Sequence, residues 1–428
     1  MSLRIINILC IFFLMSERQT FINSLFNLAN VPADAETIIQ NFDQIIQGVR
    51  PLNSKQLQQL PQNIRSLSQQ MTSDRASRRL GYMNENIQLS SYIRYFTWWN
   101  LVRLTRLFSN LPAKSFPQND CICLDLGSGP LTVVTALYLA RPELRNRKLV
   151  WYCLDISSNS MALGEDVFLS VCAKLGTDPW QIIRVKGSFG TSIKQKAEFI
   201  TCANMFNELD QANDMPPEFK VKKYFEQLVH YSQKNANFLL IEPGVPKSAR
   251  TLSLLRDRFI KDGATVLAPC PHFEECPMNG FKAYTGSKNK WCNFAFETVD
   301  APKGLQKLSE LAKLPKERAT LSFISVQYAG QSTGAVLRQA QEPREKGPIL
   351  IDLAIRITSD KIKLPNYMCG FYGCSKIGLV LVTLPDQNNT RLPKPPFVPK
   401  SGDLIQVKIK TPDSLPKDEK SGAIVIRL

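Results

Sequence analysis

Between Asp120 and Val299, short apolar runs alternate with segments of helical length. The apolar runs are CICLDLGSG, KLVWYCLDIS, QIIRVKGSF, AEFITCANMF and ANFLLIEPG, and the helical segments include LTVVTALYLARPEL, MALGEDVFLSVCAKLG and SARTLSLLRDRFIKDG. Strands that alternate with crossover helices form a parallel sheet. We therefore predict an α/β, Rossmann-like domain over residues 116–300.

The two flanks of this domain follow other patterns. Apolar residues recur at helical spacing over 36–115, as in IIQNFDQIIQGV and SYIRYFTWWNLVRLTRLF, which predicts a helical region. Beyond residue 301 the apolar runs are short and split by Pro, Gly and Asp: LSFISVQY, ILIDLAIRI, KIGLVLVTL, LIQVKIK and AIVIRL. These runs predict a small C-terminal β domain over 301–428, interrupted by an exposed polar loop over 331–347.

Residues 1–35 form a separate N-terminal segment that opens with MSLRIINILCIFFLM. This apolar run has the length of a signal peptide, but Ser16-Glu17-Arg18 follows it in place of a small-residue cleavage site. It is also too short to cross a bilayer. We expect a cytoplasmic, bacterial-type protein without stable membrane association; a membrane-tethered N-terminus is the alternative, and Met15 is a second candidate start.

The chain is strongly basic, with a formal net charge of +16 at pH 7. From Ala301 onward, 20 Lys and Arg residues stand against 11 Asp and Glu residues, a surplus of nine. Such a surplus indicates a polyanionic partner, nucleic acid above all. The alternative is that these cations only keep the surface soluble.

The string LDLGSGPLT carries the features of a nucleotide-type site. Asp125 ends a predicted strand, and Gly127 and Gly129 open the turn into a helix, where missing side chains let the backbone approach a ligand. Leu131 stands where a third glycine is usual, and Pro130 precedes it. A compact ligand such as S-adenosylmethionine therefore fits this turn better than a pyrophosphate does.

The next strands also end in polar residues. Asp155 ends the second strand, where an acidic side chain hydrogen-bonds a ribose diol in Rossmann-type sites. The fourth strand ends in ANMFNEL, which offers Asn204, Asn207 and Glu208 at the same edge of the sheet. The alternative roles are structural: Asp155 caps the turn through Ser157, and Asn207 caps a helix.

Three cysteines crowd into one loop, Cys270, Cys276 and Cys292, with the spacing C-x5-C-x15-C. Thiolates are the ligands that zinc and iron–sulfur clusters prefer. The candidates for a fourth ligand are His272, which would favour zinc, and Cys369 or Cys374 in the predicted turn YMCGFYGCSK. Unligated thiols are the alternative to a metal site.

Motifs for catalysis are missing from the sequence. A methyltransferase needs a group that positions or deprotonates the acceptor. The string ANMFNEL stands where amine methyltransferases carry Asn or Asp followed by Pro-Pro-aromatic, and a Pro-Cys nucleophile is also not matched. Glu208 is the one candidate for an acceptor-side base, so whether the protein is an enzyme stays open.

Several of these strings together resemble the ribosomal small-subunit-associated, methyltransferase-like family, whose mitochondrial members assist assembly of the mitoribosomal small subunit. They are LDLGSGPLT, IEPG followed by SARTLSLLRD, and APCPHxxxCP followed by WCNF. The resemblance runs from the helical region near Arg75 to the end of the chain, and CPHxxxCP is its most specific part.

The resemblance implies a class I methyltransferase fold that binds S-adenosylmethionine, a four-cysteine [4Fe–4S] cluster, and docking on small-subunit rRNA. By position, it implies that the cofactor-binding residues are Asp125, Gly127, Gly129 and Asp155, to which we add Asn204 from its place at the end of the fourth strand. It also implies that the metal ligands are Cys270, Cys276, Cys292 and a late cysteine, for which we choose Cys369. Asn293 departs from the family pattern, since many relatives have WCHF where this chain has WCNF.

Three hypotheses follow. The first is a monomeric assembly factor that binds rRNA or a ribosome precursor and uses the Rossmann sheet as a scaffold. The second is an active rRNA methyltransferase. The third is a metal-dependent redox or sensing protein. No small-molecule substrate is indicated beyond the cofactor. If Cys369 is the fourth ligand, the metal joins the Rossmann domain to the β domain and stabilises their interface.

Overall fold

The computed structural model describes residues 23–72, 83, 85–209, 215–281, 285, 290–330, 351–388, 393–395, 397–409 and 414–428. The apolar run at the N-terminus and the polar stretch over 331–347 lie outside the described residues. Among the described helices, none combines the length and the apolar character needed to cross a membrane.

The centre of the molecule is a twisted sheet whose strand order is β4-β3-β2-β5-β6-β9-β7. Its strands are β2 (Cys121–Leu126), β3 (Leu149–Asp155), β4 (Gln181–Lys186), β5 (Ala197–Ala203), β6 (Ser232–Glu242), β7 (Thr265–Ala268) and β9 (Arg318–Tyr328). The pairings from β4 to β6 are parallel, and β9 runs antiparallel to both β6 and β7. This order, with a reversed strand inserted before the last, is that of class I methyltransferases, so the fold prediction is confirmed.

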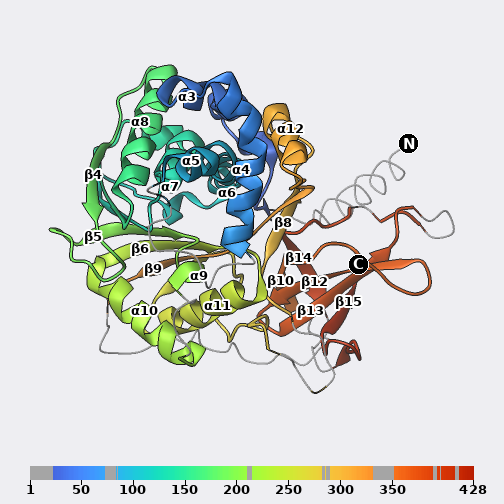
Figure 1. The fold of residues 1–428 in the computed structure, drawn as a ribbon. Coiled ribbons are helices and arrows are strands. Elements are labelled where there is room, and N and C mark those ends of the chain that lie inside the picture. Colours follow the sequence, from blue (N-terminus) through green and yellow to red (C-terminus); the bar gives the residue numbers. More distant parts are fainter. Residues whose placement is uncertain are drawn as a thin grey trace, which may run out of the picture.

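Helices cover both faces of this sheet (Figure 1). One face carries α6, α7 and α8, and the other carries α9, α10 and α11. Their bounds are α6 (Trp98–Asn110), α7 (Thr132–Ala140), α8 (Ser158–Leu175), α9 (Phe206–Leu209), α10 (Pro217–Tyr231) and α11 (Pro246–Lys261). Each face has its own apolar core because side chains alternate between the two faces along each strand: Trp151 and Cys153 belong to one core, and Tyr152 and Leu154 to the other.

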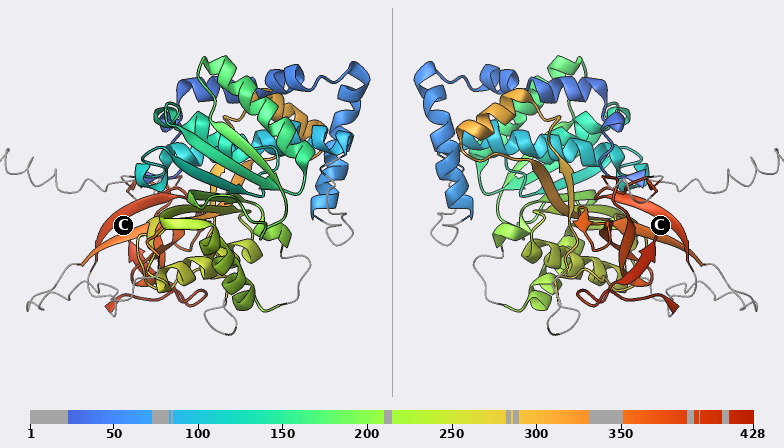
Figure 2. Two further views of the ribbon diagram at one scale, coloured as in Figure 1. Left: turned by 90° about the vertical axis from the view of Figure 1, so that its left-hand side faces the viewer. Right: turned by 90° about the vertical axis from the view of Figure 1, so that its right-hand side faces the viewer.

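The N-terminal helices extend the first of these layers, as their apolar spacing predicted. They are α2 (Ala33–Gln40), α3 (Phe42–Val49), α4 (Ser54–Thr72), α5 (Asn86–Ser91) and the π-helical turn Tyr92–Thr97, which leads into α6. Trp98 donates to the carbonyl of Ile39 at 2.8 Å, and Trp99 donates to the hydroxyl of Ser309 at 3.1 Å. Both indoles are therefore part of the core, while α4 stands out at the side of the molecule (Figure 2).

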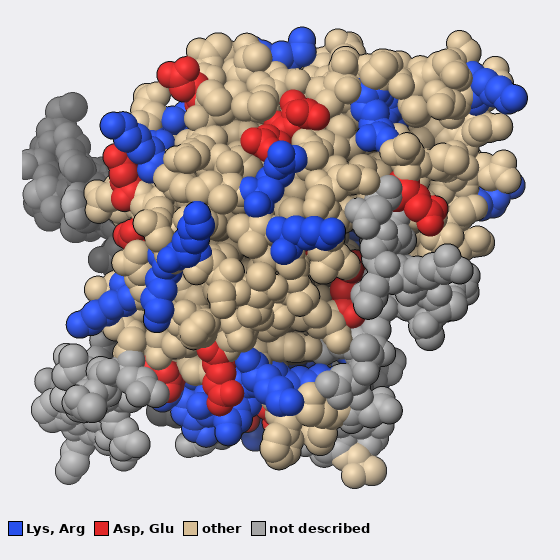
Figure 3. Space-filling model, turned by 60° about the vertical axis from the view of Figure 1, so that its left-hand side comes forward, with Lys and Arg blue, Asp and Glu red and all other residues tan. Residues whose placement is uncertain are grey.

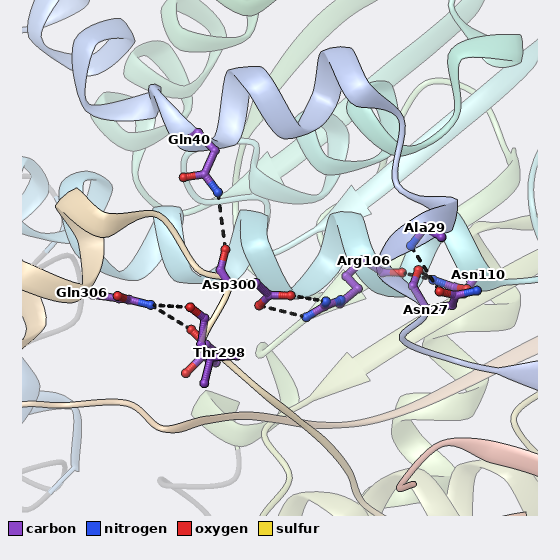
Figure 4. A network of polar contacts seen from close by, with 9 residues as sticks. Asn27, Ala29, Gln40, Arg106, Asn110, Thr298, Asp300 and Gln306 are labelled. Atoms are coloured by element: carbon purple, nitrogen blue, oxygen red, sulfur yellow. Dashed lines mark hydrogen bonds and ion pairs between the residues drawn. The ribbon is translucent and has the colours of Figure 1, made fainter. Parts of the chain in front are cut away.

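A polar network joins these helices to the chain after β8 (Phe294–Glu297) (Figure 4). Arg106 on α6 forms a two-pronged ion pair with Asp300, and its guanidinium lies 4.6 Å from the centre of the Phe296 ring. Gln40 donates to the carbonyl of Asp300 at 3.4 Å. The N-terminal helices are thus fastened to the segment that leads into α12 (Lys303–Leu311).

The C-terminal β domain lies beside these layers (Figures 1 and 2). Its strand order is β1-β14-β10-β12-β13-β15, with β15 parallel to β13 and the other pairs antiparallel. The strands are β1 (Asn23–Ser24), β10 (Ile351–Ile357), β11 (Ile362–Lys363), β12 (Met368–Ser375), β13 (Gly378–Pro385), β14 (Asp403–Ile409) and β15 (Ile424–Arg427). They cover an apolar core of their own, so the unit is a small β domain built on one open sheet.

Two sequence predictions about this part of the chain need correction. The run LSFISVQY was assigned to the β domain, but it is β9 of the Rossmann sheet. The C-terminal strands of the β domain therefore begin at β10 and not at residue 301, and β1 joins them from the N-terminal part of the chain. The segment YMCGFYGCSK was predicted as a turn, but most of it is strand β12. A Cβ at Gly373 would lie 2.7 Å from the Ile355 side chain, so this glycine permits close packing and does not mark a turn.

Candidate cofactor site and thiol cluster

The glycine-rich turn after β2 has the backbone that its sequence predicts. Gly127 and Gly129 have positive φ values of 67° and 49°, which favour glycine. A Cβ on Gly127 would lie 3.1 Å from the side chain of Met205, so the turn is also closely packed. On the other side, a Cβ at Gly164 of α8 would lie 2.3 Å from the backbone of Pro130, and this missing side chain is what lets α8 approach the turn.

The amide groups of this turn donate to acceptors within the protein. Gly127 and Ser128 donate to the carbonyl of Leu154, Gly129 donates to the Asp155 carboxylate at 2.9 Å, and Leu131 donates to Ser128. Pro130 has no amide hydrogen. A phosphate group would need such amides free to bind it. The turn therefore suits a ligand without phosphate, in agreement with the sequence interpretation.

Asp125 is fully buried below this turn. Its Oδ1 accepts a hydrogen bond of 2.7 Å from the Thr201 hydroxyl, whereas its Oδ2 is buried without a partner among the described residues. Burial raises the pKa of this carboxyl from 3.8 to about 7. Asn204, at the end of β5, has φ of 61° and a buried Oδ1 that also lacks a partner in the described chain.

Asp155, at the end of β3, holds the turn together. Its carboxylate accepts hydrogen bonds from the amides of Gly129 at 2.9 Å and Ser157 at 2.8 Å. Burial raises its pKa, while those amide donors act in the opposite direction. Asp155 thus performs the capping role that the sequence offered as the alternative, and its contact with a ribose stays a prediction.

Glu242, at the end of β6, was not singled out from the sequence. The residue is fully buried, and its two carboxylate oxygens accept the amides of Phe206 at 2.9 Å and Asn207 at 3.1 Å. These amides begin α9, so Glu242 caps this short helix and fixes the loop that carries Asn204. Glu208, the candidate base, lies on α9 with its side chain exposed.

The three loop cysteines meet next to the β domain. Cys270 follows β7, Cys292 precedes β8, and both line one cavity together with Cys276. Cys374 of β12 is the fourth neighbour, because its cross-strand partner Arg356 donates to the carbonyl of Pro269, the residue before Cys270. The thiols of Cys270 and Cys276 accordingly raise the pKa of Cys374. Burial is the largest cause of these shifts, and it raises the pKa of Cys276 to about 11.

Cys369, the fourth ligand expected from the sequence, does not join this group. Its side chain belongs to the core of the β domain, and its Sγ lies 3.9 Å from the carbonyl oxygen of Pro385. Cys369 and Cys374 are five residues apart on one strand, and alternate residues of a strand face opposite sides. The expected position of Cys369 is therefore corrected, and Cys374 is the cysteine beside the loop.

His272, the other candidate ligand, is buried with only 5% of its surface exposed. Neither ring nitrogen has a partner among the described residues, and burial lowers the pKa of the imidazole to about 4. Its carbonyl oxygen, not its ring, accepts a hydrogen bond from Arg256. Within the described ranges, no set of three or more His, Cys, Asp or Glu side chains is arranged to hold a metal ion.

Comparisons with known proteins place the chain in context. A search of curated proteins gives no match. Among solved structures, a methyltransferase from Thiobacillus denitrificans in complex with S-adenosyl-L-homocysteine matches with 13% identity and a TM-score of 0.31, covering 53% of this chain and 90% of that one. The precorrin-6y C5,15-methyltransferase of Geobacter metallireducens matches with 11% identity and a TM-score of 0.30, covering 51% of this chain and 84% of that one.

The family comparison is more extensive. The profile of the family described as mitochondrial small ribosomal subunit Rsm22 matches residues 105–357, which is more than half of the 428 residues. The match includes the glycine-rich turn, the three loop cysteines and strand β9. The chain belongs to the Rsm22 family.

Proposed function

We propose that this protein is an assembly factor of the small ribosomal subunit that binds S-adenosylmethionine and ribosomal RNA and carries a cysteine-ligated iron–sulfur cluster. The observation that carries the proposal is the pair of unpaired, buried acceptor oxygens of Asp125 and Asn204 at the ligand edge of a methyltransferase sheet, in a chain of a ribosomal small-subunit family.

The cofactor proposal depends on charge and hydrogen bonding. S-adenosylmethionine carries a cationic amino group and a sulfonium, which suit an edge bearing two carboxylates, Asp125 and Asp155. The free oxygens of Asp125 and Asn204 would accept donors of the cofactor, and Asp155 would meet its ribose. When bound, S-adenosylmethionine supplies an electrophilic methyl group.

The RNA proposal depends on the β domain. Its described surface exposes Lys and Arg side chains at positions 361, 363, 376, 394, 400, 408, 417, 420 and 427, against exposed acidic residues at 352, 360 and 419. Figure 3 shows the side of the molecule turned away from the β domain, and Lys and Arg side chains also gather at the lower edge of that face. An excess of exposed cations favours binding to the phosphates of RNA.

The cluster proposal depends on the thiols. Three of them line one cavity and the fourth lies beside it, which gives the set of four thiolate donors that both iron–sulfur clusters and structural zinc sites use. Cys270, Cys276, Cys292 and Cys374 would hold the cluster. It would supply a rigid link between the two domains.

The RNA proposal is tested by titrating purified protein with small-subunit rRNA at increasing salt. Binding that weakens steeply as salt rises is expected, because each phosphate contact releases counterions. Affinity that is independent of salt, or equal for an acidic protein of similar size, would contradict the proposal.

Methyl transfer is the second candidate function, and the unpaired oxygen of Asp125 is the observation that favours it. The test is transfer of a labelled methyl group to rRNA by the wild-type protein and by Asp125→Asn, with Asp166→Asn on the exposed face of α8 as the matched control. Cofactor binding without methyl transfer would rule out the enzyme and would leave the assembly factor as the remaining candidate function. Loss of cofactor binding in both variants would count against the site.

The cluster proposal is tested by iron, sulfide and zinc analysis of protein purified without oxygen. We expect iron and sulfide in equal amounts, a brown colour that dithionite bleaches, and loss of both in Cys270→Ser. Zinc in a one-to-one ratio to protein would contradict the cluster and indicate a mononuclear zinc site. Protein without any metal would contradict the metal proposal altogether.

A further inference from the structure

Two buried arginines flank the thiol cluster, one from each domain. Arg256 comes from α11 of the Rossmann domain and exposes 1% of its surface, and Arg356 comes from β10 of the β domain and exposes 6%. Arginine is costly to bury unless its donors are satisfied, so these positions require a reason in their surroundings.

Arg256 holds the first half of the cysteine loop. Its Nε donates to Cys270 Sγ at 3.2 Å, its Nη2 donates to the His272 carbonyl at 2.7 Å, and its Nη1 donates to the Glu274 carbonyl at 2.8 Å. Asp257 pairs with the same Nη1 and is itself partly exposed. The planar fork of one guanidinium thus fixes the backbone between two of the cysteines and also donates directly to a thiol sulfur.

Arg356 contacts the same cysteine loop from the β domain. It is the cross-strand partner of Cys374, so the two side chains lie on the same face of the sheet. Its Nε donates to the carbonyl of Pro269, the residue before Cys270, at 2.9 Å, and its Nη1 donates to the carbonyls of Gly402 at 2.7 Å and Asn23 at 3.1 Å. Asp403 is the acidic group that faces it within its own domain.

We infer that Arg256 and Arg356 are positioning residues of the thiol centre: Arg256 sets the loop and donates to a ligand sulfur, and Arg356 brings the strand of Cys374 against the loop of Cys270. The inference rests on the proposed metal function. Donors around metal ligands orient those ligands and tune the metal, and their loss costs 10- to 100-fold in metal affinity in other proteins. The hydrogen bond to sulfur also stabilises the more negative, reduced state of a cluster.

The experiment compares wild type, Arg256→Gln, Arg356→Gln and Arg256→Lys, loaded with iron and sulfide under anaerobic conditions. The matched control is Arg94→Gln, because Arg94 is also a buried arginine but donates to Gln47 and to the carbonyl of Arg50, away from the thiols. The readouts are the rate of iron release to a chelator and the reduction potential of the cluster.

We expect release at least about tenfold faster for both Gln variants, and for Arg256→Gln a shift to a more negative potential. Arg256→Lys keeps the charge but not the fork, so it should recover the potential more fully than the release rate. Circular dichroism identifies variants that do not fold. If Arg256→Gln does not fold, Arg256→Lys is compared with wild type in its place.

The outcomes separate the two proposals. Wild-type protein without metal would overturn the metal function and this inference with it. Wild-type protein with a cluster, together with arginine variants that match Arg94→Gln in both readouts, would overturn the inference alone and leave the metal function intact.

Discussion

The cofactor edge and the thiol cluster are assembled from different ranges of the chain. Asp125 and Asp155 lie near the ends of two parallel strands of one sheet, Asn204 directly follows a third, and neighbouring strands bring these ends together. The thiols come from the loop over 270–292 and from β12, which belongs to another domain. For the cofactor edge, it is enough to know that a residue lies at the carboxyl end of a parallel strand. The thiol cluster also depends on which face of a strand each cysteine occupies.

The largest effect is expected from the two cysteines of β12. Cys374→Ser should lose the metal centre and with it on the order of 10 kcal/mol of metal-binding free energy, because the remaining thiols cannot complete the site. Cys369→Ser should keep the metal and lose about 1 kcal/mol of stability through a polar group in an apolar core. Metal analysis and urea unfolding of both variants provide the measurement. Equal metal loss in both variants would show that the face of β12 does not determine which cysteine binds the metal.

The cofactor edge should respond to pH. The pKa of Asp125 is about 7 in the folded protein against an ordinary 3.8, so the folded state holds this proton more tightly than the unfolded state. The resulting stability is fully present below about pH 4 and is lost as the pH rises through about 7, up to about 4 kcal/mol. Urea unfolding at several pH values should show this fall in the ligand-free wild type. Asp125→Asn should remove it, and a cationic cofactor should reduce it.

A smaller effect is expected at the cap of α9. Glu242→Gln replaces one of two buried oxygens that accept backbone amides by an NH2 group, which should cost about 1–3 kcal/mol of unfolding free energy and weaken cofactor binding. Glu208→Gln, on the exposed side of the same helix, should change stability by less than about 0.5 kcal/mol. Thermal unfolding of the pair is sufficient. Equal losses would mean that Glu242 does not hold the loop of Asn204.

The smallest effect concerns RNA. Lys376→Gln, in the exposed connection between β12 and β13, should make the negative slope of log affinity against log salt less steep by about 0.7–0.9. Lys55→Gln on the distant helix α4 is the control and should leave the slope unchanged. A slope that shifts equally in both variants would assign RNA binding to overall charge and not to the β domain.

Much of the fold could be predicted from the sequence because each parallel strand and its following helix carry their own apolar pattern. Strand β9 was misplaced because its pattern does not reveal an antiparallel insertion between two earlier strands. Strand β12 was mistaken for a turn because Gly370 and Gly373 are usual in turns, whereas here neighbouring side chains leave no room for a Cβ. That error also hid which of Cys369 and Cys374 faces the loop.

The position of β9 has a consequence for the order of synthesis. Because β9 lies between β6 and β7 but follows both in sequence, the sheet stays open until residue 328 has been made. Three of the four thiols are translated before this closing strand, and Cys374 is translated after it. On the nascent chain, the sulfurs therefore become available in two steps: three before the sheet closes, and the sulfur of Cys374 only when the β domain is synthesised.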